Sequence, residues 1–246
     1  MKAEGKHWLS PQFLAPNILE VDVAMDAVAP AMSLVNEVRH IDGTNKTIAL
    51  ASGQTLNVKS MSSVWQSDIL WISQDDIPTY EFFRTIFFSC GVAGAVAERI
   101  SFKNELRLYS GFFVTRSTCS RPDFHFDWLN CNNDAFTVLM PLTPNCSDMG
   151  LIYKNARGGL SDYRYQMGKA VIFGDHFCHS TAPGQTSERC VLLSFTFGTD
   201  RMDNWPKIAE TATAQGQMHC RPDGVFVRDN VVLEAARGQP TAPIAR

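Results

Sequence analysis

Three short apolar runs, at residues 136–142, 169–173 and 190–197, most constrain the fold of this chain. The runs are rich in β-branched and aromatic residues, which favour strands, and the second ends at the break Gly174-Asp175. Their nearly continuous apolar character is typical of strands buried in a core. The sequence therefore predicts a mainly β protein with flanking helices.

Three potential metal ligands lie close to these runs. His125 and Asp127 are two positions apart, and on a strand residues i and i+2 point to the same face, so one imidazole and one carboxylate can reach one point. The same alternation puts Phe126 and Trp128 on the other face. His179, beyond the run 169–173, can supply a third ligand. Two histidines and one carboxylate leave coordination positions free for substrate, oxygen or water, as in non-haem Fe(II) enzymes.

His176 competes with His179 for the position of the third ligand. We assign the ligand to His179 because small residues and Pro183-Gly184 follow it, which is the turn expected before a next strand. His176 is then a residue that lines the pocket or a histidine of a surface loop. Separate substitution of each histidine distinguishes these alternatives.

Arg189 lies ten positions after His179 and opens the run 190–197. Its guanidinium fork suits paired, charge-assisted hydrogen bonds to a carboxylate. The alternative is an ion pair with the adjacent Glu188 or a place at a strand edge, which stabilises little. The spacing favours a carboxylate anchor.

Together, His125, Asp127, His179 and Arg189 resemble the motif of the Fe(II)/2-oxoglutarate-dependent oxygenase superfamily, over roughly residues 106–198. The resemblance implies a double-stranded β-helix, which is a jelly-roll, cupin-like core. It implies that His125, Asp127 and His179 are the catalytic iron ligands and that Arg189 binds the far carboxylate of 2-oxoglutarate. Relatives often carry a serine two residues after the arginine, where this chain has Val191.

The same resemblance implies a dioxygenase that converts 2-oxoglutarate and O2 to succinate and CO2 while it oxidises a small molecule, with ascorbate as an auxiliary reductant. Hydroxylation is favoured over halogenation, because halogenating relatives lack the carboxylate that Asp127 provides. Two alternatives stay open: a cupin-type metalloenzyme that does not use 2-oxoglutarate, and a jelly-roll binding protein without turnover. Arg107, Tyr109 and Arg116 either contact ligands or face solvent, and residues 130–134 either line the pocket mouth or form a plain turn.

We expect one oxygenase domain over residues 1–246, with the barrel at about 106–198. Residues 1–105 should add a helix at 25–38, a hairpin at 46–58 that turns at Ser52-Gly53, and a buried helix from about 78 to 100. Two strands, 106–109 and 112–115, should break at Ser110-Gly111. The C-terminal extension, 199–246, should contain a short helix at 205–213 and could cover the barrel as a lid.

Composition excludes several classes of partner. The net charge of −3 and the pI near 6.1 give no footprint for nucleic acid, and the most apolar stretch, residues 85–97, is too short to cross a membrane. Residues 1–8 lack the apolar core of a signal peptide, and the seven cysteines include no C-x-x-C pair. We therefore expect a cytoplasmic monomer or homodimer that acts on a small molecule.

Overall fold

The computed structural model describes residues 13–15, 18–44, 46–61, 67–229 and 231–235. Its helices are α1 (Met25–Met32), α2 (Val35–Arg39), α4 (Ile77–Ser89), α5 (Val92–Ala97), the 3-10 helix η1 (Pro144–Asp148) and α6 (Trp205–Gln215). Its strands are β1 (Phe13–Ala15), β2 (Ile18–Asp22), β3 (Lys46–Ala49), β4 (Thr55–Ser60), β5 (Leu70–Gln74), β6 (Leu106–Cys119), β7 (Ala135–Pro141), β8 (Leu151–Lys154), β9 (Leu160–Tyr163), β10 (Lys169–Phe173), β11 (His179–Thr181), β12 (Gly184–Thr199), β13 (Met218–Cys220), β14 (Val225–Arg228) and β15 (Val231–Ala235).

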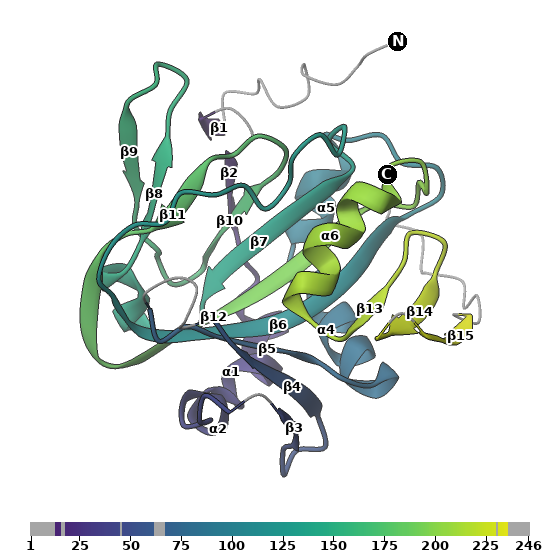
Figure 1. The fold of residues 1–246 in the computed structure, drawn as a ribbon, viewed down its shortest axis with the longest axis horizontal. Coiled ribbons are helices and arrows are strands. Elements are labelled where there is room, and N and C mark those ends of the chain that lie inside the picture. The colour runs from purple at the N-terminus through teal and green to yellow at the C-terminus, as the bar shows by residue number, and fades with distance from the viewer. Residues whose placement is uncertain (1–12, 16–17, 45, 62–66, 230, 236–246) are drawn as a thin grey trace.

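A large antiparallel sheet dominates the described part of the chain, in the order β1-β2-β10-β7-β12-β6-β5-β4-β3 (Figure 1). Two small sheets, β11-β8-β9 and β13-β14-β15, accompany it. The three apolar runs of the sequence are β10, β7 and β12, which are neighbours in the large sheet. The predicted mainly β, jelly-roll architecture with flanking helices is confirmed.

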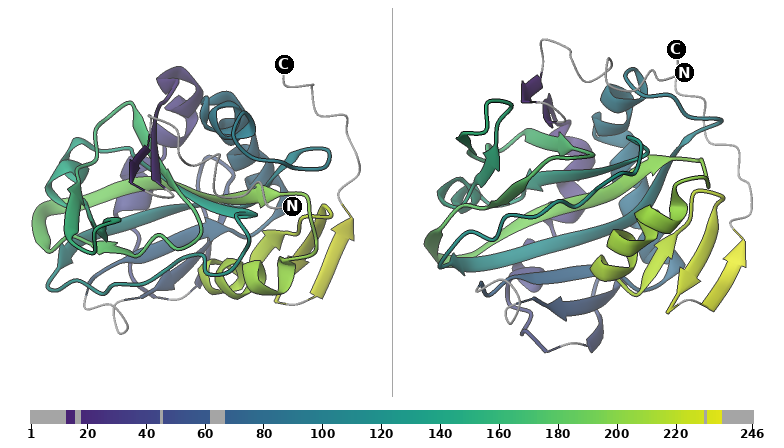
Figure 2. Two further views of the ribbon diagram at one scale, coloured as in Figure 1. Left: turned by 90° about the horizontal axis from the view of Figure 1, so that it is seen from above. Right: turned by 45° about the horizontal axis from the view of Figure 1, so that its top comes forward.

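The central strands of the large sheet are buried on both faces, and each face belongs to a different apolar core. On β12, Val191, Leu193 and Phe195 belong to a core shared with the helices, whereas Cys190 and Leu192 belong to a second core beneath β8 and β9. Figure 2 shows helices α1, α2, α4 and α5 together on one side of the sheet. Burial on both faces explains why residues 190–197 of β12 are largely apolar on both faces.

The predicted helices are present but interrupted. Asp76 caps α4 by accepting a hydrogen bond from the Thr79 amide at 2.8 Å, so the predicted start near residue 78 is confirmed. The predicted continuity to residue 100 is wrong, because Gly91 adopts φ +94° and separates α4 from α5. The predicted helix at 25–38 is likewise two helices, α1 and α2.

The predicted break at Ser110-Gly111 is wrong, because β6 runs without interruption from Leu106 to Cys119. A side chain at Gly111 would collide with the ring of Phe83 on α4. The glycine therefore permits close packing of a helix on the sheet and does not mark a turn. The predicted hairpin is confirmed as β3–β4, with Gly53 at φ +97°, and the predicted helix at 205–213 is confirmed as α6.

All seven cysteines are buried free thiols. Within the ranges that the structure describes, no helix has the length and apolar character needed to cross a bilayer. The interpretations of residues 1–8 and of the chain end beyond residue 235 lie outside the described residues.

Candidate metal centre

His125 and His179 are held together by their own backbones. The two residues form an isolated antiparallel bridge, in which each amide donates to the other's carbonyl oxygen at 3.0 Å. His179 is the first residue of β11. The i, i+2 argument assumed that His125 lies in a strand, but His125 forms only this isolated bridge. The bridge to β11 fixes the position of His125 instead.

Both imidazoles present Nε2 to the same point. His125 Nδ1 lies 2.8 Å from the Asp123 carbonyl oxygen, and His179 Nδ1 lies 3.1 Å from that of Phe177. Because a carbonyl can only accept, each Nδ1 carries the proton and each Nε2 keeps its lone pair for a metal. Asp127 Oδ1 lies 3.5 Å from Nε2 of His125 and 3.8 Å from Nε2 of His179.

The three candidate ligand atoms lie within 4.8 Å of one another. Two neutral imidazoles and one carboxylate on one side of a point suit a divalent transition metal with open coordination positions. Asp127 is oriented by Thr137 of β7, whose hydroxyl donates to Asp127 Oδ2 at 2.7 Å, while Trp128 Nε1 donates to the same hydroxyl oxygen at 2.9 Å. Trp128 thus supports the carboxylate and is fully buried, whereas Phe126 is 44% exposed.

Electrostatics shift the pKa values of all three candidate ligands. Burial lowers the pKa of His125, but the neighbouring Asp127 outweighs burial and raises it. Burial raises the pKa of Asp127, but the two neighbouring histidines outweigh it and lower the pKa to about 2. Burial lowers the pKa of His179 to about 4. At neutral pH, Asp127 is therefore an anion and His179 is neutral.

A pocket that opens beside these ligands is lined mainly by apolar side chains, among them Trp71, Phe112 and Phe173. Apart from the three ligand residues, its one charged lining side chain in the described ranges is Arg116 of β6, which is 3% exposed. Arg116 Nη1 donates to Thr181 Oγ1 at 2.8 Å, and Nη2 lies 3.3 Å from the Met149 carbonyl oxygen.

The charge of Arg116 is buried, and no carboxylate among the described residues pairs with it. Its Nε makes no hydrogen bond to any described residue, and the same holds for the buried hydroxyl of Tyr165. Burial lowers the pKa of Arg116, but Tyr165 and Cys190 more than offset this effect, so the guanidinium stays charged. A buried, charged and incompletely paired guanidinium is a site for a carboxylate.

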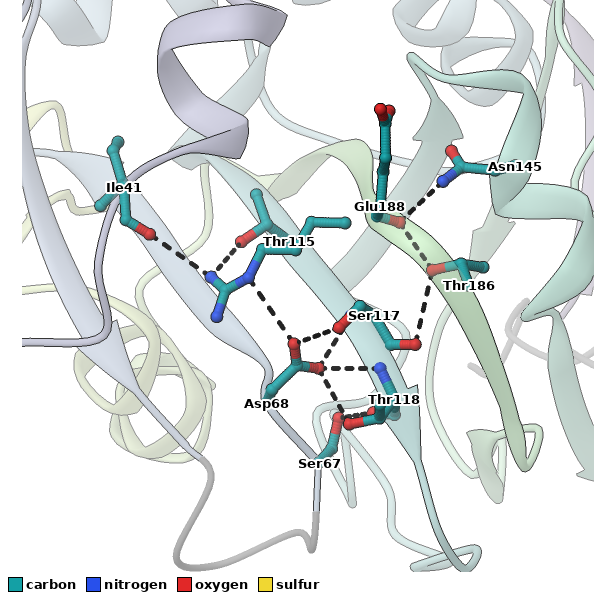
Figure 3. A network of polar contacts seen from close by, with 10 residues as sticks. Ile41, Ser67, Asp68, Thr115, Ser117, Thr118, Asn145, Thr186 and Glu188 are labelled. Atoms are coloured by element: carbon teal, nitrogen blue, oxygen red, sulfur yellow. Dashed lines mark hydrogen bonds and ion pairs between the residues drawn. The ribbon is translucent and has the colours of Figure 1, made fainter.

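Arg189 is not brought to the three ligands. Cys190, its neighbour on β12, faces the pocket side, and Arg189 points the other way, with Nη1 3.4 Å from the carbonyl oxygen of Ile41 and from Thr115 Oγ1. Its Nε lies 3.6 Å from Oδ2 of Asp68. Figure 3 shows Asp68 within a network that also includes Ser117 and Thr118. Glu188 pairs with Arg39 instead of Arg189.

The remaining candidates also lie away from the pocket. His176 is exposed in a turn, with φ +62°. The histidine that lies with His125 and Asp127 is His179. Residues 130–134 form a turn in which three asparagines have positive φ, and the backbone amides of Cys131 and Asn133 donate to the Asp175 carboxylate. Tyr109 donates to the Thr199 carbonyl oxygen at 2.8 Å, and Arg107 pairs with Glu105.

No protein-family model matches this chain, and no curated protein matches it either. Solved structures do resemble it. The non-heme alpha ketoglutarate dependent epimerase SnoN from nogalamycin biosynthesis gives a TM-score of 0.50 at 12% identity, over 75% of this chain and 79% of that chain. An oxidoreductase of the 2OG-Fe(II) oxygenase family from Burkholderia pseudomallei gives 0.50 at 9% identity, over 74% of this chain and 84% of that chain. At such low identity the likeness shows the fold, which is the fold that the sequence resemblance implied.

Proposed function

We propose that this protein is an Fe(II)/2-oxoglutarate-dependent dioxygenase that oxidises, most simply by hydroxylation, a small molecule. The observation that carries the proposal is the convergence of His125, Asp127 and His179 in a pocket that also holds the buried guanidinium of Arg116. The fold shared with SnoN and the Burkholderia oxidoreductase supports it.

The donor set fits the metal. Nε2 of His125 and of His179 and Oδ1 of Asp127 would hold Fe(II), while Thr137 and the two backbone carbonyls fix their orientation. Bound Fe(II), with 2-oxoglutarate and O2, would supply the oxidising chemistry and yield succinate and CO2. The protein's own contribution is to position the reactants and to exclude water.

We propose Arg116, in place of Arg189, as the anchor for the far carboxylate of 2-oxoglutarate. His179 and Thr181 lie two residues apart on β11, and alternate residues of a strand share a face at a spacing of about 7 Å. Arg116 donates to Thr181, so it lies one such step from the metal ligands. This separation is comparable with the length of a five-carbon dicarboxylate.

The wider arrangement supports one domain over residues 1–246. Strands β1 to β5, which precede residue 106, are part of the same sheet as β7, β10 and β12, and Gln215 of α6 lines the pocket from the C-terminal side. A buried pocket of this kind suits a small-molecule substrate. Seven free thiols suit the reducing cytoplasm that we propose for the protein.

The test uses the full chain and measures binding before turnover. Under anaerobic conditions, Fe(II) followed by 2-oxoglutarate should produce the visible charge-transfer absorption of a chelated 2-oxo acid, and admission of O2 should yield succinate. Asp127→Ala should abolish both signals. Metal binding without a response to 2-oxoglutarate would favour the cupin-type alternative, and binding of neither would favour a binding protein without turnover.

A further inference from the structure

Several buried polar atoms near the pocket lack a partner. The hydroxyls of Ser73, Ser110 and Ser194 and the Oε1 atom of Gln215 make no hydrogen bond to any described residue. Ser194 and Gln215 also line the pocket of the metal centre. Such atoms are unfavourable when left unsatisfied, and in native structures they are uncommon, so a ligand that pairs with them is favoured.

These two residues lie away from the proposed carboxylate anchor. On β12, Cys190 is opposite Arg116, and Ser194 is four residues further along, which corresponds to about 13 Å of strand. Ser194 is opposite Leu139 and Phe112, next to the level at which Thr137 holds Asp127. Along β12, Ser194 therefore lies between the level of Arg116 and the level of Thr137, close to the metal ligands and well separated from the Arg116 end of the pocket.

Gln215 is held in place from two directions. It is the last residue of α6, and α6 is tied to the metal centre because Thr211 donates to the backbone carbonyl oxygen of Asp127. The following residue, Gly216, packs so closely on β5 that a Cβ atom there would lie 2.6 Å from Ser73 Oγ. A side chain positioned this firmly can orient a ligand.

The surroundings of Gln215 and Ser194 restrict the kind of ligand. The charged side chains that line this pocket in the described ranges are the three metal-ligand residues and Arg116. Other lining residues, such as Ile69, Trp71 and Phe112, are apolar or aromatic. A second carboxylate or phosphate would find no counter-charge in the described pocket lining other than Arg116, which 2-oxoglutarate would occupy.

We propose that Gln215, together with Ser194, binds the polar group of an uncharged, largely apolar substrate, through a hydrogen bond to a hydroxyl or an N–H group. This inference rests on the proposed function, since it assigns Gln215 and Ser194 to the oxidised molecule and Arg116 to 2-oxoglutarate. Gln215 thereby determines specificity and orients the substrate carbon that is presented to the metal.

The test compares two probes of equal shape, phenol and toluene, which differ by a hydroxyl and a methyl group. Their dissociation constants are measured by ligand-observed NMR on the full chain with Zn(II) and saturating 2-oxoglutarate. In Gln215→Leu, the ratio of the phenol constant to the toluene constant should rise roughly 5- to 100-fold, because the substitution removes one buried hydrogen bond. Gln217→Leu is the matched control, since Gln217 is exposed and lines a separate hollow beside β3 and β4; it should leave the ratio unchanged.

An unchanged ratio in a folded Gln215→Leu protein overturns the inference, as does failure of both probes to bind the wild-type protein. If Gln215→Leu does not fold, Ser194→Ala takes its place and should shift the ratio in the same direction. The stabilisation of each variant by 2-oxoglutarate is recorded in the same samples. If 2-oxoglutarate does not stabilise the wild-type protein, the proposed function is contradicted. A change in the probe ratio in Gln215→Leu would still show that Gln215 binds the hydroxyl group of the probe.

Discussion

The choice between Arg116 and Arg189 as the co-substrate anchor gives the sharpest prediction. Arg116 is 3% exposed and has no anionic partner among the described residues, whereas the Arg189 side chain is 24% exposed and lies near Asp68. We expect Arg116→Leu to weaken binding of 2-oxoglutarate severely and Arg189→Leu to leave it intact. The two substitutions are chemically identical, so each serves as the control for the other.

The magnitudes follow from burial. Removing one partner of a buried, hydrogen-bonded ion pair costs about 3–5 kcal/mol, so Arg116→Leu should weaken 2-oxoglutarate binding roughly 100- to 4,000-fold. Arg116→Lys keeps the charge but loses the planar fork, and should give an intermediate loss. Arg189→Leu removes a partly exposed pair and two long hydrogen bonds, so it should cost about 1 kcal/mol of stability, or roughly 2–4 °C.

Calorimetric titration of 2-oxoglutarate into the Zn(II)-loaded variants measures the first effect, and thermal unfolding measures the second. At a 2-oxoglutarate concentration 100 times the wild-type dissociation constant, the ligand should stabilise the wild-type protein by about 2.7 kcal/mol and Arg116→Leu by about 0.4 kcal/mol or less. The opposite pattern, with binding lost in Arg189→Leu and kept in Arg116→Leu, would refute the assignment and restore Arg189 as the anchor.

Three further predictions address the metal and the frame around it. His179→Ala should lose Zn(II) binding while His176→Ala retains it, measured by metal content after dialysis, since His179 alone of the two joins His125 and Asp127. Gly111→Ala should destabilise the fold by about 1–3 kcal/mol through collision with Phe83, measured by urea unfolding; an unchanged midpoint would contradict the packing argument. Burial raises the pKa of Asp68, but hydrogen bonds from Ser117 and Thr118 outweigh burial, so the pKa in the folded protein is lowered. The ionised Asp68 carboxylate therefore stabilises the fold above about pH 3.9, and this stabilisation is lost as the pH falls below that value. The stability difference between wild type and Asp68→Asn should therefore shrink between pH 7 and pH 3, and a difference that grows would contradict it.

The grouping of His125, Asp127 and His179 could be predicted from the sequence, because each of the two segments that carry them has a local signal. His125 and Asp127 are two residues apart, and the small residues after His179 indicated the end of a ligand-bearing segment. The strands β7, β10 and β12 were also recognisable, since buried strands give long apolar runs. The bridge that joins His125 to His179 could not be foreseen, because it depends on how two distant segments meet.

The anchor could not be assigned from spacing, because a count of residues does not reveal which face of a strand a side chain occupies. The pairing of β12 with β6 is irregular between Gln185 and Cys190, and Arg189 comes out of this irregular stretch on the helix side. Strand alternation could have indicated Arg116, because Arg116 lies on the same face of β6 as Phe112 and Val114. The signal was hidden because residues 112–115 are apolar or buried on both faces, so neither face is marked as the pocket side.

The same two-sided burial explains how the fold combines stability with chemistry. The helix-facing residues of β6 and β12 pack against α4 and its neighbours, where Gly111 allows Phe83 to approach, and this face carries no ligand. The opposite face carries the unfavourable features of the described residues: a charged arginine that pairs with no carboxylate, and hydroxyl and amide oxygen atoms that make no hydrogen bond. Because helix packing stabilises the strands independently, the pocket face can keep groups that are satisfied only when ligands bind. Substitutions on the helix face should thus affect unfolding, and those on the pocket face should affect binding.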